Sequence, residues 1–457
     1  MTYFLAIDIG ASSGRHILGH VEKGKLLLEE IYRFENNIME QEGSIVWDMI
    51  HLTNQVKAGI GVCKTLGKIP KTIAIDTWAV DYVLLDENGE EIWPCVAYRD
   101  PRTNGVPEQF HRAFTAELLY ERSGIQPLNF NTLFQIYCDQ RSGKLDQAKR
   151  LLMVPEYLSY KLTGVMKNEY TNTTTGGFVQ VTTRQIDHEL FRMLNIPTSL
   201  WGDLCVPGTT VGNFTQEIKE EMGFDATVIF CPSHDTASAV AACPVGDNGV
   251  YISSGTWSLI GTELTTPITT PEALHAGFTN EGGILYRYRF LKNFMGMWLF
   301  QNIRRNLDKQ YTYDQMMEMA MASSYTKTID PNAPEFVAPA NMIEAIRTHL
   351  GEPELPIGDV LASVYHSLAL SYKGAVETIE QLTGKEIDLI NIIGGGSKDR
   401  YLNQLTKQYT GKRVLAGPTE ATATGNLIAQ LMADDPALTL EKAREMIKDS
   451  FELVEVE

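Results

Sequence analysis

The opening residues of the chain are patterned as a meander of strands. Residues 4–9 form an apolar run that is broken only by Asp8 near its end, which is typical of a buried strand that runs out into polar surroundings. Residues 15–21 and 26–34 are rich in aliphatic side chains and predict two further strands. Small residues over 10–14 and the run Lys23-Gly24-Lys25 predict the turns that connect them.

Helical and strand patterns alternate after this meander. Residues 53–66 predict a helix, residues 72–76 a buried strand and residues 82–86 a further strand, and Asn88-Gly89 marks a tight turn. Hairpins mixed with alternating helices and strands are characteristic of an α/β fold.

The same theme returns in the second half of the chain. Residues 249–261 predict a strand, a small polar turn and a second strand, and residues 389–393 predict a strand that leads through a glycine-rich turn into a helix over 398–409. A chain of 457 residues is also too long for one ordinary hydrophobic core. We therefore expect two large α/β domains, over residues 1–243 and 244–457.

Composition and charge narrow the classes of function. Hydrophobic residues make up 44% of the chain and charged residues 21%, as in a soluble globular protein. The formal net charge of −18 would repel a polyphosphate backbone, which argues against nucleic acid as a partner. A nucleotide phosphate can still bind through local N–H groups and a metal ion. No stretch approaches the roughly 18 apolar residues of a membrane-spanning helix, and the short apolar start lacks the basic residues of a signal peptide.

The cysteines predict neither a disulfide framework nor a zinc site. They are scattered, without a C-x-x-C pair, at Cys63, Cys95, Cys138, Cys205, Cys231 and Cys243. We expect reduced thiols of a cytoplasmic protein.

The first turn has the composition of a phosphate-binding hairpin. Ala11, Ser12, Ser13 and Gly14 carry small side chains or none, so that a phosphate could approach the backbone N–H groups. The segment lacks the Gly-Lys-Ser/Thr ending of a Walker loop, and a strand follows it where a dinucleotide fingerprint would have a helix. Asp8, at the end of the preceding strand, is suited to hold water on Mg²⁺. An ordinary hairpin turn is the alternative explanation.

Asp235 is the candidate for the chemical step. An apolar strand over 227–230 leads into Cys231-Pro232-Ser233-His234-Asp235-Thr236, and a helix of small residues over 237–242 follows. Asp235 is therefore expected on a strand-to-helix turn, at the edge of the sheet where α/β folds bind ligands. A carboxylate there can orient a sugar hydroxyl and accept its proton while ATP is attacked. The alternative is that Asp235 only caps the helix.

Two later turns could contact a nucleotide. Ser253-Ser254-Gly255-Thr256 combines hydroxyl groups with glycine and could hold a second phosphate. Gly394-Gly395-Gly396-Ser397 would let an adenine or ribose lie against the backbone. A plain hairpin turn and a plain strand-to-helix connection are the respective alternatives.

Two further segments are composed like a sugar site, since a polyol needs hydrogen-bonding groups around an apolar or aromatic wall. Asp76-Thr77-Trp78-Ala79-Val80-Asp81 combines carboxylates with an indole, and residues 291–301 contain Trp298 with the amides of Asn293 and Gln301. The alternative for the second segment is a core helix, because its apolar positions 295, 298 and 299 fall at helical spacing.

In their order along the chain, these motifs resemble the FGGY family of carbohydrate kinases. The order is an Asp-x-Gly-x-x-x-Gly hairpin, a central His-Asp-Thr, a Ser-Gly-Thr turn and a late Gly-Gly-Gly helix start, and it extends over nearly the whole chain. The resemblance implies two actin-like, ribonuclease H-like α/β ATPase domains with an interdomain cleft. It also implies ATP and Mg²⁺ as cofactors and a small-molecule ketose substrate, without nucleic-acid or membrane partners. A monomer and a homodimer both stay open.

The resemblance implies roles for individual residues at the matching positions. ATP would contact Ala11, Ser12, Ser13, Gly14 and Arg15, together with Thr256, Gln301 and one of Gly394, Gly395 and Gly396, and Asp8 would serve the metal. The sugar would contact Trp78, Ala79, Asp81, His234, Asp235, Thr236 and Asn293, with Asp235 as the general base.

Within the family, the chain resembles the branch that phosphorylates L-rhamnulose. The segments that carry this likeness are residues 11–15, 75–78, 97–100, 169–172, 233–240, 253–259, 279–283 and 291–293. Glycerol kinases have a Gln-Arg-Glu run where this chain has Trp78-Ala79-Val80. The branch commonly has glycine at the position of Ala79, which puts the pocket shape there in question.

Other functions fit parts of the same pattern. The substrate could be another ketose, such as L-fuculose or L-xylulose. Little more than the configuration of one hydroxyl group separates these sugars from L-rhamnulose, and a sequence shows such a difference poorly. A sugar-sensing regulator on the same fold would need a helix-turn-helix and a basic face, and the chain opens directly on the phosphate hairpin instead. A structural actin-like filament protein would have no use for Asp235 and the sugar-site residues.

Overall fold

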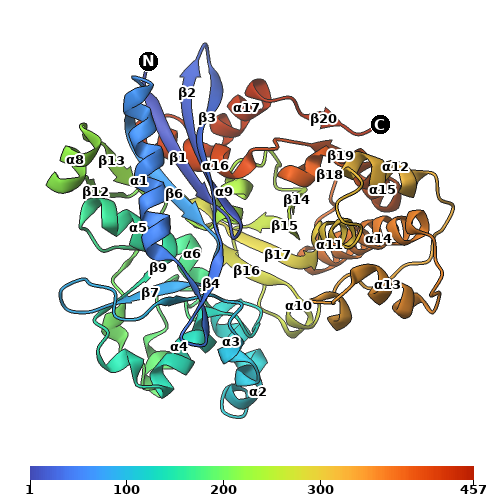
Figure 1. Ribbon diagram of the computed structural model, residues 1–457, viewed down its shortest axis with the longest axis horizontal. Coiled ribbons are helices and arrows are strands. Elements are labelled where there is room, and N and C mark those ends of the chain that lie inside the picture. Colours follow the sequence, from blue (N-terminus) through green and yellow to red (C-terminus); the bar gives the residue numbers. More distant parts are fainter. The chain divides into compact units, whose positions relative to one another are not determined.

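The computed structural model describes all residues from 1 to 457 and divides into two compact units. The first comprises residues 1–242, 264–289 and 422–450, and the second residues 243–263, 290–421 and 451–457. Each unit has its own central sheet (Figure 1). The domain boundary that the sequence predicts after residue 243 stays a prediction. None of the helices has the length and apolar character of a membrane-spanning segment.

The central sheet of the first unit has six strands in the order β12-β13-β6-β1-β2-β3. β1 (Tyr3–Ile9), β2 (Ser13–Glu22) and β3 (Lys25–Glu35) form an antiparallel meander, while β6 (Pro70–Thr77) and β13 (Thr227–Ile229) run parallel to β1 and to each other. β12 (Thr210–Asn213) closes the sheet antiparallel to β13. The predicted opening meander and the buried strand after it are confirmed.

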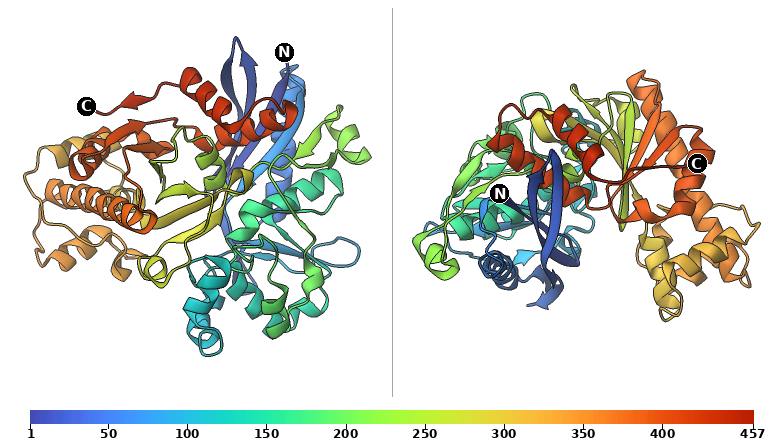
Figure 2. Two further views of the ribbon diagram at one scale, coloured as in Figure 1. Left: turned by 180° about the vertical axis from the view of Figure 1, so that it is seen from behind. Right: turned by 90° about the horizontal axis from the view of Figure 1, so that it is seen from above.

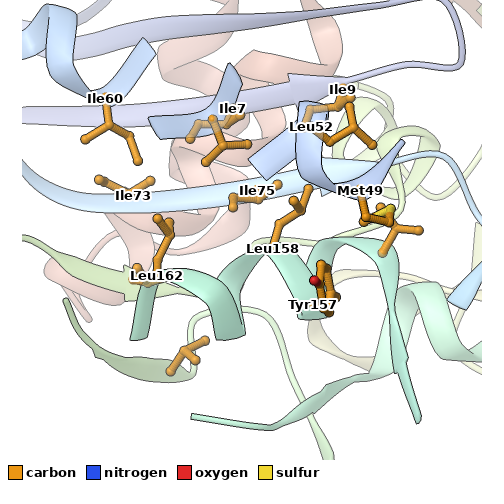
Figure 3. Close-up of a cluster of buried hydrophobic side chains, with 14 of the residues drawn as sticks. Ile7, Ile9, Met49, Leu52, Ile60, Ile73, Ile75, Tyr157, Leu158 and Leu162 are labelled. Atoms are coloured by element: carbon orange, nitrogen blue, oxygen red, sulfur yellow. The ribbon is translucent and has the colours of Figure 1, made fainter. Parts of the chain in front are cut away.

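Alternation along the two central strands gives the sheet two different faces. Ile7 and Ile9 of β1 and Ile73 and Ile75 of β6 point to one face, because successive side chains of a strand alternate. Helices α1 (Met49–Thr65) and α5 (Val154–Thr163) cover this face with buried aliphatic side chains (Figure 3). Each fully buried side chain of this kind stabilises the fold by about 1.5–3 kcal/mol.

The residues that alternate with these isoleucines along the strands, among them Asp8 and Asp76, point to the opposite face. Helix α16 (Ala421–Asp434) packs there and is tied to the sheet by two amides. Gln430 donates to the carbonyl of Leu5 (2.9 Å), and Asn426 donates to Asp76 (2.6 Å). In Figure 2 the red C-terminal helices lie beside the blue strands of this sheet in both views.

The remaining elements of the first unit surround this sheet or form a second core of their own. The strands are β4 (Ile38–Gln41), β5 (Ser44–Trp47), β7 (Tyr82–Leu85), β8 (Cys95–Val96), β9 (Arg150–Met153), β10 (Asn168–Glu169), β11 (Leu204–Cys205) and β16 (Thr279–Gly282). The helices are α2 (Val106–Phe110), α3 (Ala116–Ser123), α4 (Thr132–Arg141), α6 (Tyr170–Thr174), α7 (His188–Met193), α8 (Gln216–Met222), α9 (Asp235–Ala241), α10 (Pro271–His275) and α17 (Leu440–Ser450).

The second unit repeats the plan of the first. β14 (Gly249–Ser254), β15 (Trp257–Leu264) and β17 (Tyr288–Met295) are neighbours in the sheet, and β18 (Leu389–Ile393) and β19 (Arg413–Ala416) continue it parallel to β14. β20 (Val454–Glu455) pairs antiparallel with β19. The predicted return of the meander in the second half is therefore confirmed.

Five helices complete the second unit. They are α11 (Trp298–Asn306), α12 (Tyr313–Met321), α13 (Met342–Leu350), α14 (Ile357–Thr383) and α15 (Arg400–Thr410). The long α14 is buried along one side from Val360 to Ile379 and packs on α12 and α15.

Two predicted helices are placed differently from the sequence pattern. α1 begins at Met49, four residues before the predicted start, because the side chain of Asp48 caps it by accepting from the N–H of His51 (2.8 Å). The helical spacing over 295–299 is misleading, since Met295 ends strand β17 and only Trp298 begins α11. Asn293 accordingly lies on a strand and Gln301 on a helix.

Candidate active site

The predicted phosphate hairpin is the tight connection between β1 and β2. The N–H of Gly10 donates to the carbonyl of Ser13 (2.9 Å), and Asn36 donates to the carbonyls of Gly10 and Ser12 (2.9 and 3.0 Å). These contacts fix the loop while Ser12 stays exposed and Ala11 partly exposed. The loop is therefore rigid and accessible, as a phosphate-binding turn must be.

Gly14 is not the turn glycine that the sequence predicts. It lies in strand β2, outside the left-handed region of backbone conformation, and a Cβ placed on it would collide with the ring of Phe34. Close packing against Phe34, and not the approach of a ligand, explains why glycine is needed at this position.

Asp8 faces two residues across the sheet. Its pairing partner on β2 is Arg15, whose Nε and Nη2 donate to Oδ2 of Asp8 (3.1 and 3.0 Å). Its pairing partner on β6 is Asp76. Both guanidinium nitrogens donate to the same oxygen of Asp8, so Arg15 serves an internal ion pair.

Asp76 is the third residue of this group, and the sequence pattern predicts no separate role for it. Its carboxyl group is fully buried, with Oδ2 bonded to Asn426 and Oδ1 without a hydrogen-bond partner. Burial, and then the negative charge of Asp8, raise the pKa of Asp76 well above its usual range. An orphaned buried oxygen beside a second carboxylate is a position where a proton or a hydrated cation would be stabilised.

Trp78 lies against a second indole that the sequence did not single out. The rings of Trp47 and Trp78 are 4.1 Å apart between centroids, and both indole N–H groups donate to Oδ2 of Asp81 (2.7 and 2.9 Å). Gln135 and the N–H of Tyr98 donate to the same carboxylate. Asp81 is 1% exposed and its carboxylate holds both indoles, while a direct contact of Asp81 with a sugar stays a prediction.

Burial raises the pKa of Asp81 to about 6, although the two indole hydrogen bonds, Gln135 and the N–H of Tyr98 oppose this shift. The indole pair is thus held by a carboxylate that is ionised at neutral pH.

The turn between Trp78 and Asp81 is strained. Val80 has φ of 69°, which is in the left-handed region that β-branched residues avoid, and the N–H of Asp81 donates to the carbonyl of Ala79 (3.0 Å) across it. Thr132 and Gln135 hold the turn by donating to the carbonyl of Val80 (2.7 and 3.2 Å). Strain of this kind costs about 1–3 kcal/mol and marks functional loops.

The loop after β13 carries the candidate base and is anchored by a buried acid. Glu169 is fully buried and accepts hydrogen bonds from the hydroxyl (2.5 Å) and N–H (3.3 Å) of Ser233, while the N–H of Thr77 donates to the carbonyl of Ser233 (2.9 Å). The neighbouring Glu156 accepts the N–H of Glu169, and burial raises the pKa of Glu156 to about 8. These contacts fix the backbone directly before His234.

Asp235 is the first residue of α9, and its N-cap is His234. The alternative that Asp235 merely caps the helix is therefore wrong. Oδ1 of Asp235 accepts hydrogen bonds from the N–H and the hydroxyl of Thr236 and lies 3.3 Å from Nε2 of His234. The side chain is 31% exposed, and Oδ2 has no hydrogen-bond donor from the protein.

Behind His234 lies a fully buried arginine. Nη2 of Arg289 is 3.0 Å from Nδ1 of His234 and 2.9 Å from Oε2 of Glu281, and Nε donates to the carbonyl of Gly282 (2.9 Å). Burial opposes ionisation of Glu281, but the charge of Arg289 lowers its pKa.

In the second unit, the Ser-Gly-Thr turn is joined to the start of α11. The carbonyls of Gly255 and Thr256 accept the N–H groups of Met297 and Trp298 (both 3.1 Å). Thr256 is exposed, and Asn293 and Gln301 are half-buried. The Nε1–H of Trp298 donates to the carbonyl of Phe336, so this indole serves packing.

The three glycines after β18 differ in their surroundings. Gly394 has φ of +82°, and a Cβ on Gly396 would collide with the side chain of Ser254. No atom lies within 4 Å of the Cβ position of Gly395. Gly395 is thus the member of the run with open space beside it.

Comparison with known proteins decides the family. Residues 3–242 match the N-terminal domain of the FGGY family of carbohydrate kinases, and residues 250–433 match its C-terminal domain. The chain belongs to the FGGY family of carbohydrate kinases. The predicted family and fold class are confirmed, and the chain is a sugar kinase.

Curated relatives of this kinase cover nearly the whole chain. A rhamnulokinase from Halalkalibacterium halodurans is 45% identical, with 99% of this chain and 98% of that protein covered. A rhamnulokinase from Oceanobacillus iheyensis is 43% identical, covering 98% and 97%. A rhamnulokinase from Bacillus subtilis is 39% identical, covering 98% and 94%.

Solved structures support the fold at low sequence identity. A ligand-bound xylulose kinase from Lactobacillus acidophilus has a TM-score of 0.83 at 15% identity, covering 99% of this chain and 93% of that one. A Plasmodium falciparum glycerol kinase with ADP has a TM-score of 0.78 at 15% identity, covering 99% and 94%.

Several residues of the site were beyond sequence reasoning. Trp47 lies on β5, in a hairpin that no motif marks, and Arg289 carries no local pattern. Glu169 and Glu281 stand in two of the segments that resemble the family, and no motif there predicts a role for either acid. A buried carboxylate or guanidinium shows its importance only through partners that are distant along the chain.

Proposed function

We propose that the chain transfers the γ-phosphoryl group of ATP to L-rhamnulose and releases L-rhamnulose 1-phosphate and ADP. The observation that carries the proposal is the carboxylate of Asp235, which stands on a strand-to-helix turn with one oxygen held by donors and the other open. The rhamnulokinase relatives that extend over nearly the whole chain support L-rhamnulose as the acceptor.

The chemical step requires a carboxylate near the attacking hydroxyl. As the sugar oxygen bonds to the γ-phosphorus, its O–H bond breaks, the proton passes to Asp235 and the bond to the β-phosphate oxygen breaks. Thr236 and His234 flank this carboxylate and are proposed to contact the sugar.

The sugar is proposed to lie against Trp78 and the backbone of Ala79, with Asn293 as a further contact. The half-buried Ala79 follows Trp78 directly, and the rigid turn at Val80 supports an N–H in a defined direction. Because a backbone contact does not use the side chain, the methyl group of Ala79 is compatible with it. Asp81 acts one step further away, through the indoles.

The nucleotide is proposed to bind the exposed turn formed by Ala11, Ser12 and Ser13, with Gly14 and Arg15 supporting it from β2. In the second unit, Thr256, Gln301 and the open backbone at Gly395 are the proposed contacts, with Gly394 and Gly396 shaping the turn.

Mg²⁺ is the proposed companion of ATP. The carboxylates of Asp8 and Asp76 are pairing partners on adjacent strands, and the orphaned oxygen of Asp76 fits a water ligand of the ion. Mg²⁺ would supply charge neutralisation to the phosphates. The proposal includes a cytoplasmic location, where ATP and reduced thiols coexist.

Asp235→Asn tests the proposal. The amide is nearly isosteric but cannot take the proton, so ketose-dependent ADP release should fall by about a hundredfold or more. Asp308→Asn is the matched control, because Asp308 is exposed and asparagine tolerates its positive φ of 50°. Turnover of Asp235→Asn close to that of the control would refute the assignment.

A further inference from the structure

We infer that Arg289 is a positioning residue that fixes the proton of His234 on Nε2 and thereby makes Oδ2 of Asp235 the oxygen that accepts the substrate proton. The inference deepens the proposed function, because it rests on Asp235 as the general base. Arg289 is distant from Asp235 along the chain, and it acts on the carboxylate of Asp235 through the imidazole ring of His234.

The first step concerns the ring nitrogen that faces the arginine. A guanidinium carries only donors and stays protonated, so the nitrogen opposite it must accept. Nη2 of Arg289 is 3.0 Å from Nδ1 of His234, which therefore holds a lone pair and no hydrogen. In a neutral imidazole the single proton is then on Nε2.

The second step concerns why this arginine keeps its place. Arg289 has no exposed surface, its Nε donates to the carbonyl of Gly282, and its charge is paired with Glu281 at 2.9 Å. A buried arginine without a counter-ion would be strongly destabilising. Glu281 therefore holds the guanidinium, and the guanidinium holds the ring.

A competing arrangement would bring a proton to Nδ1, directed at Glu281. Oε2 of Glu281 is 3.4 Å from Nδ1, which is longer than the 3.0 Å from Arg289 to the same nitrogen. A hydrogen on Nδ1 would also face the N–H of Arg289, so two donors would oppose each other across that shorter distance. The geometry favours the tautomer with the proton on Nε2.

The third step leads to the base. Nε2 of His234 lies 3.3 Å from Oδ1 of Asp235, and Thr236 donates two hydrogen bonds to this same oxygen. The two Thr236 donors, with the Nε2–H of His234 at ion-pair distance, stabilise the carboxylate at Oδ1 and leave Oδ2, which no protein donor reaches, as the open acceptor. In the transfer, the hydroxyl proton of the ketose ends on Oδ2 while the new O–P bond forms.

Nitrogen NMR on the unaltered enzyme tests the tautomer directly. In protein labelled with ¹⁵N at histidine, the two ring nitrogens differ in their shifts and couplings according to which one carries the proton, and His234→Gln identifies the signals by their disappearance. We expect the proton on Nε2 at neutral pH. A proton on Nδ1 overturns the inference.

Kinetics test the consequence. The double variant Glu281→Gln/Arg289→Met removes both charges together and leaves no unpaired charge buried, and the unaltered enzyme is its reference. We expect kcat of the double variant to be about tenfold below that of the unaltered enzyme, the scale of one hydrogen bond to a charged group. Equal kcat values of the folded double variant and the unaltered enzyme overturn the inference.

A third background separates positioning from plain structural support. In His234→Gln the side-chain amide has no tautomers, so adding the pair Glu281→Gln/Arg289→Met to His234→Gln should leave kcat unchanged within error. A further tenfold loss would mean that Arg289 acts by some route other than His234. If Asp235→Asn itself retains turnover, the proposed function fails. If Asp235→Asn is inactive but the variant that carries Arg289→Met keeps its full kcat, only the role of Arg289 is refuted.

Discussion

His16 provides a quantitative test of the core beside the phosphate hairpin. The ring is fully buried on β2, with Nε2 3.1 Å from the carbonyl of Val56 and Nδ1 without a partner. Tyr32 contacts it edge-on, and Gly59 leaves it just enough room. Because burial disfavours the imidazolium, the pKa of His16 is lowered to about 4 from its ordinary 6.5, although the Val56 carbonyl opposes the shift.

The sign of the effect follows from this lowered pKa. Above pH 6.5 the ring is neutral in both the folded and unfolded chain, and its contribution to stability is fully present. As the pH falls from 6.5 toward 4, the unfolded chain binds a proton that the folded chain does not, which costs about 1.4 kcal/mol per pH unit. At pH 5 the free energy of unfolding should therefore be about 2 kcal/mol lower on account of His16.

Other buried groups titrate in the opposite sense, so the measurement must be a difference. Burial raises the pKa of Asp81 to about 6 and that of Glu156 to about 8, which favours the folded chain as the pH falls. His16→Gln retains a donor for the Val56 carbonyl and does not titrate. Urea unfolding of both proteins at pH 7 and pH 5 should show the difference in unfolding free energy moving by about 2 kcal/mol in favour of the variant. A difference that is the same at both pH values refutes the reasoning.

Four further substitutions test the proposed sugar and nucleotide contacts. Val80→Gly relieves the positive φ and loosens the turn, so KM for the ketose should rise about tenfold in steady-state kinetics, and an unchanged KM would contradict a positioning role. Gly395→Val should raise KM for ATP with little change in melting temperature. Gly396→Val places a side chain against Ser254 and should lower the melting temperature measured by calorimetry. A lower melting temperature for Gly395→Val than for Gly396→Val would exchange their roles. Asp81→Asn turns an amide N–H toward Gln135 and should shift tryptophan emission as the indoles loosen, so an unaltered spectrum would count against the carboxylate as their anchor.

Local patterns were enough for much of the fold. The opening meander, the return of its theme after residue 249 and the strand-to-helix turn at Asp235 all depend on short-range alternation and on small residues at turns, which a sequence records directly. The family resemblance rested on the order of such turns, and it is confirmed.

The supporting contacts were not predictable, because they join distant segments. The sequence predicts a sugar contact for Asp81 but does not show that its carboxylate holds the indoles of Trp47 and Trp78. It predicts a phosphate contact for Gly14 but does not show that the ring of Phe34 packs against this glycine. A motif identifies a residue with a functional or structural role, whereas the side chains that contact this residue are determined by the packing of the whole unit.

L-rhamnulose is the proposed phosphoryl acceptor of this kinase, and ATP is the proposed donor. The most direct test is the purified chain with Mg-ATP and a panel of L-rhamnulose, L-fuculose, L-xylulose and glycerol, with ADP release coupled to a spectrophotometric readout and the sugar phosphate identified by mass spectrometry. We expect the highest kcat/KM for L-rhamnulose and a poor value for glycerol, because glycerol covers little of the Trp78 wall. A higher kcat/KM for any other member of the panel would contradict the substrate assignment.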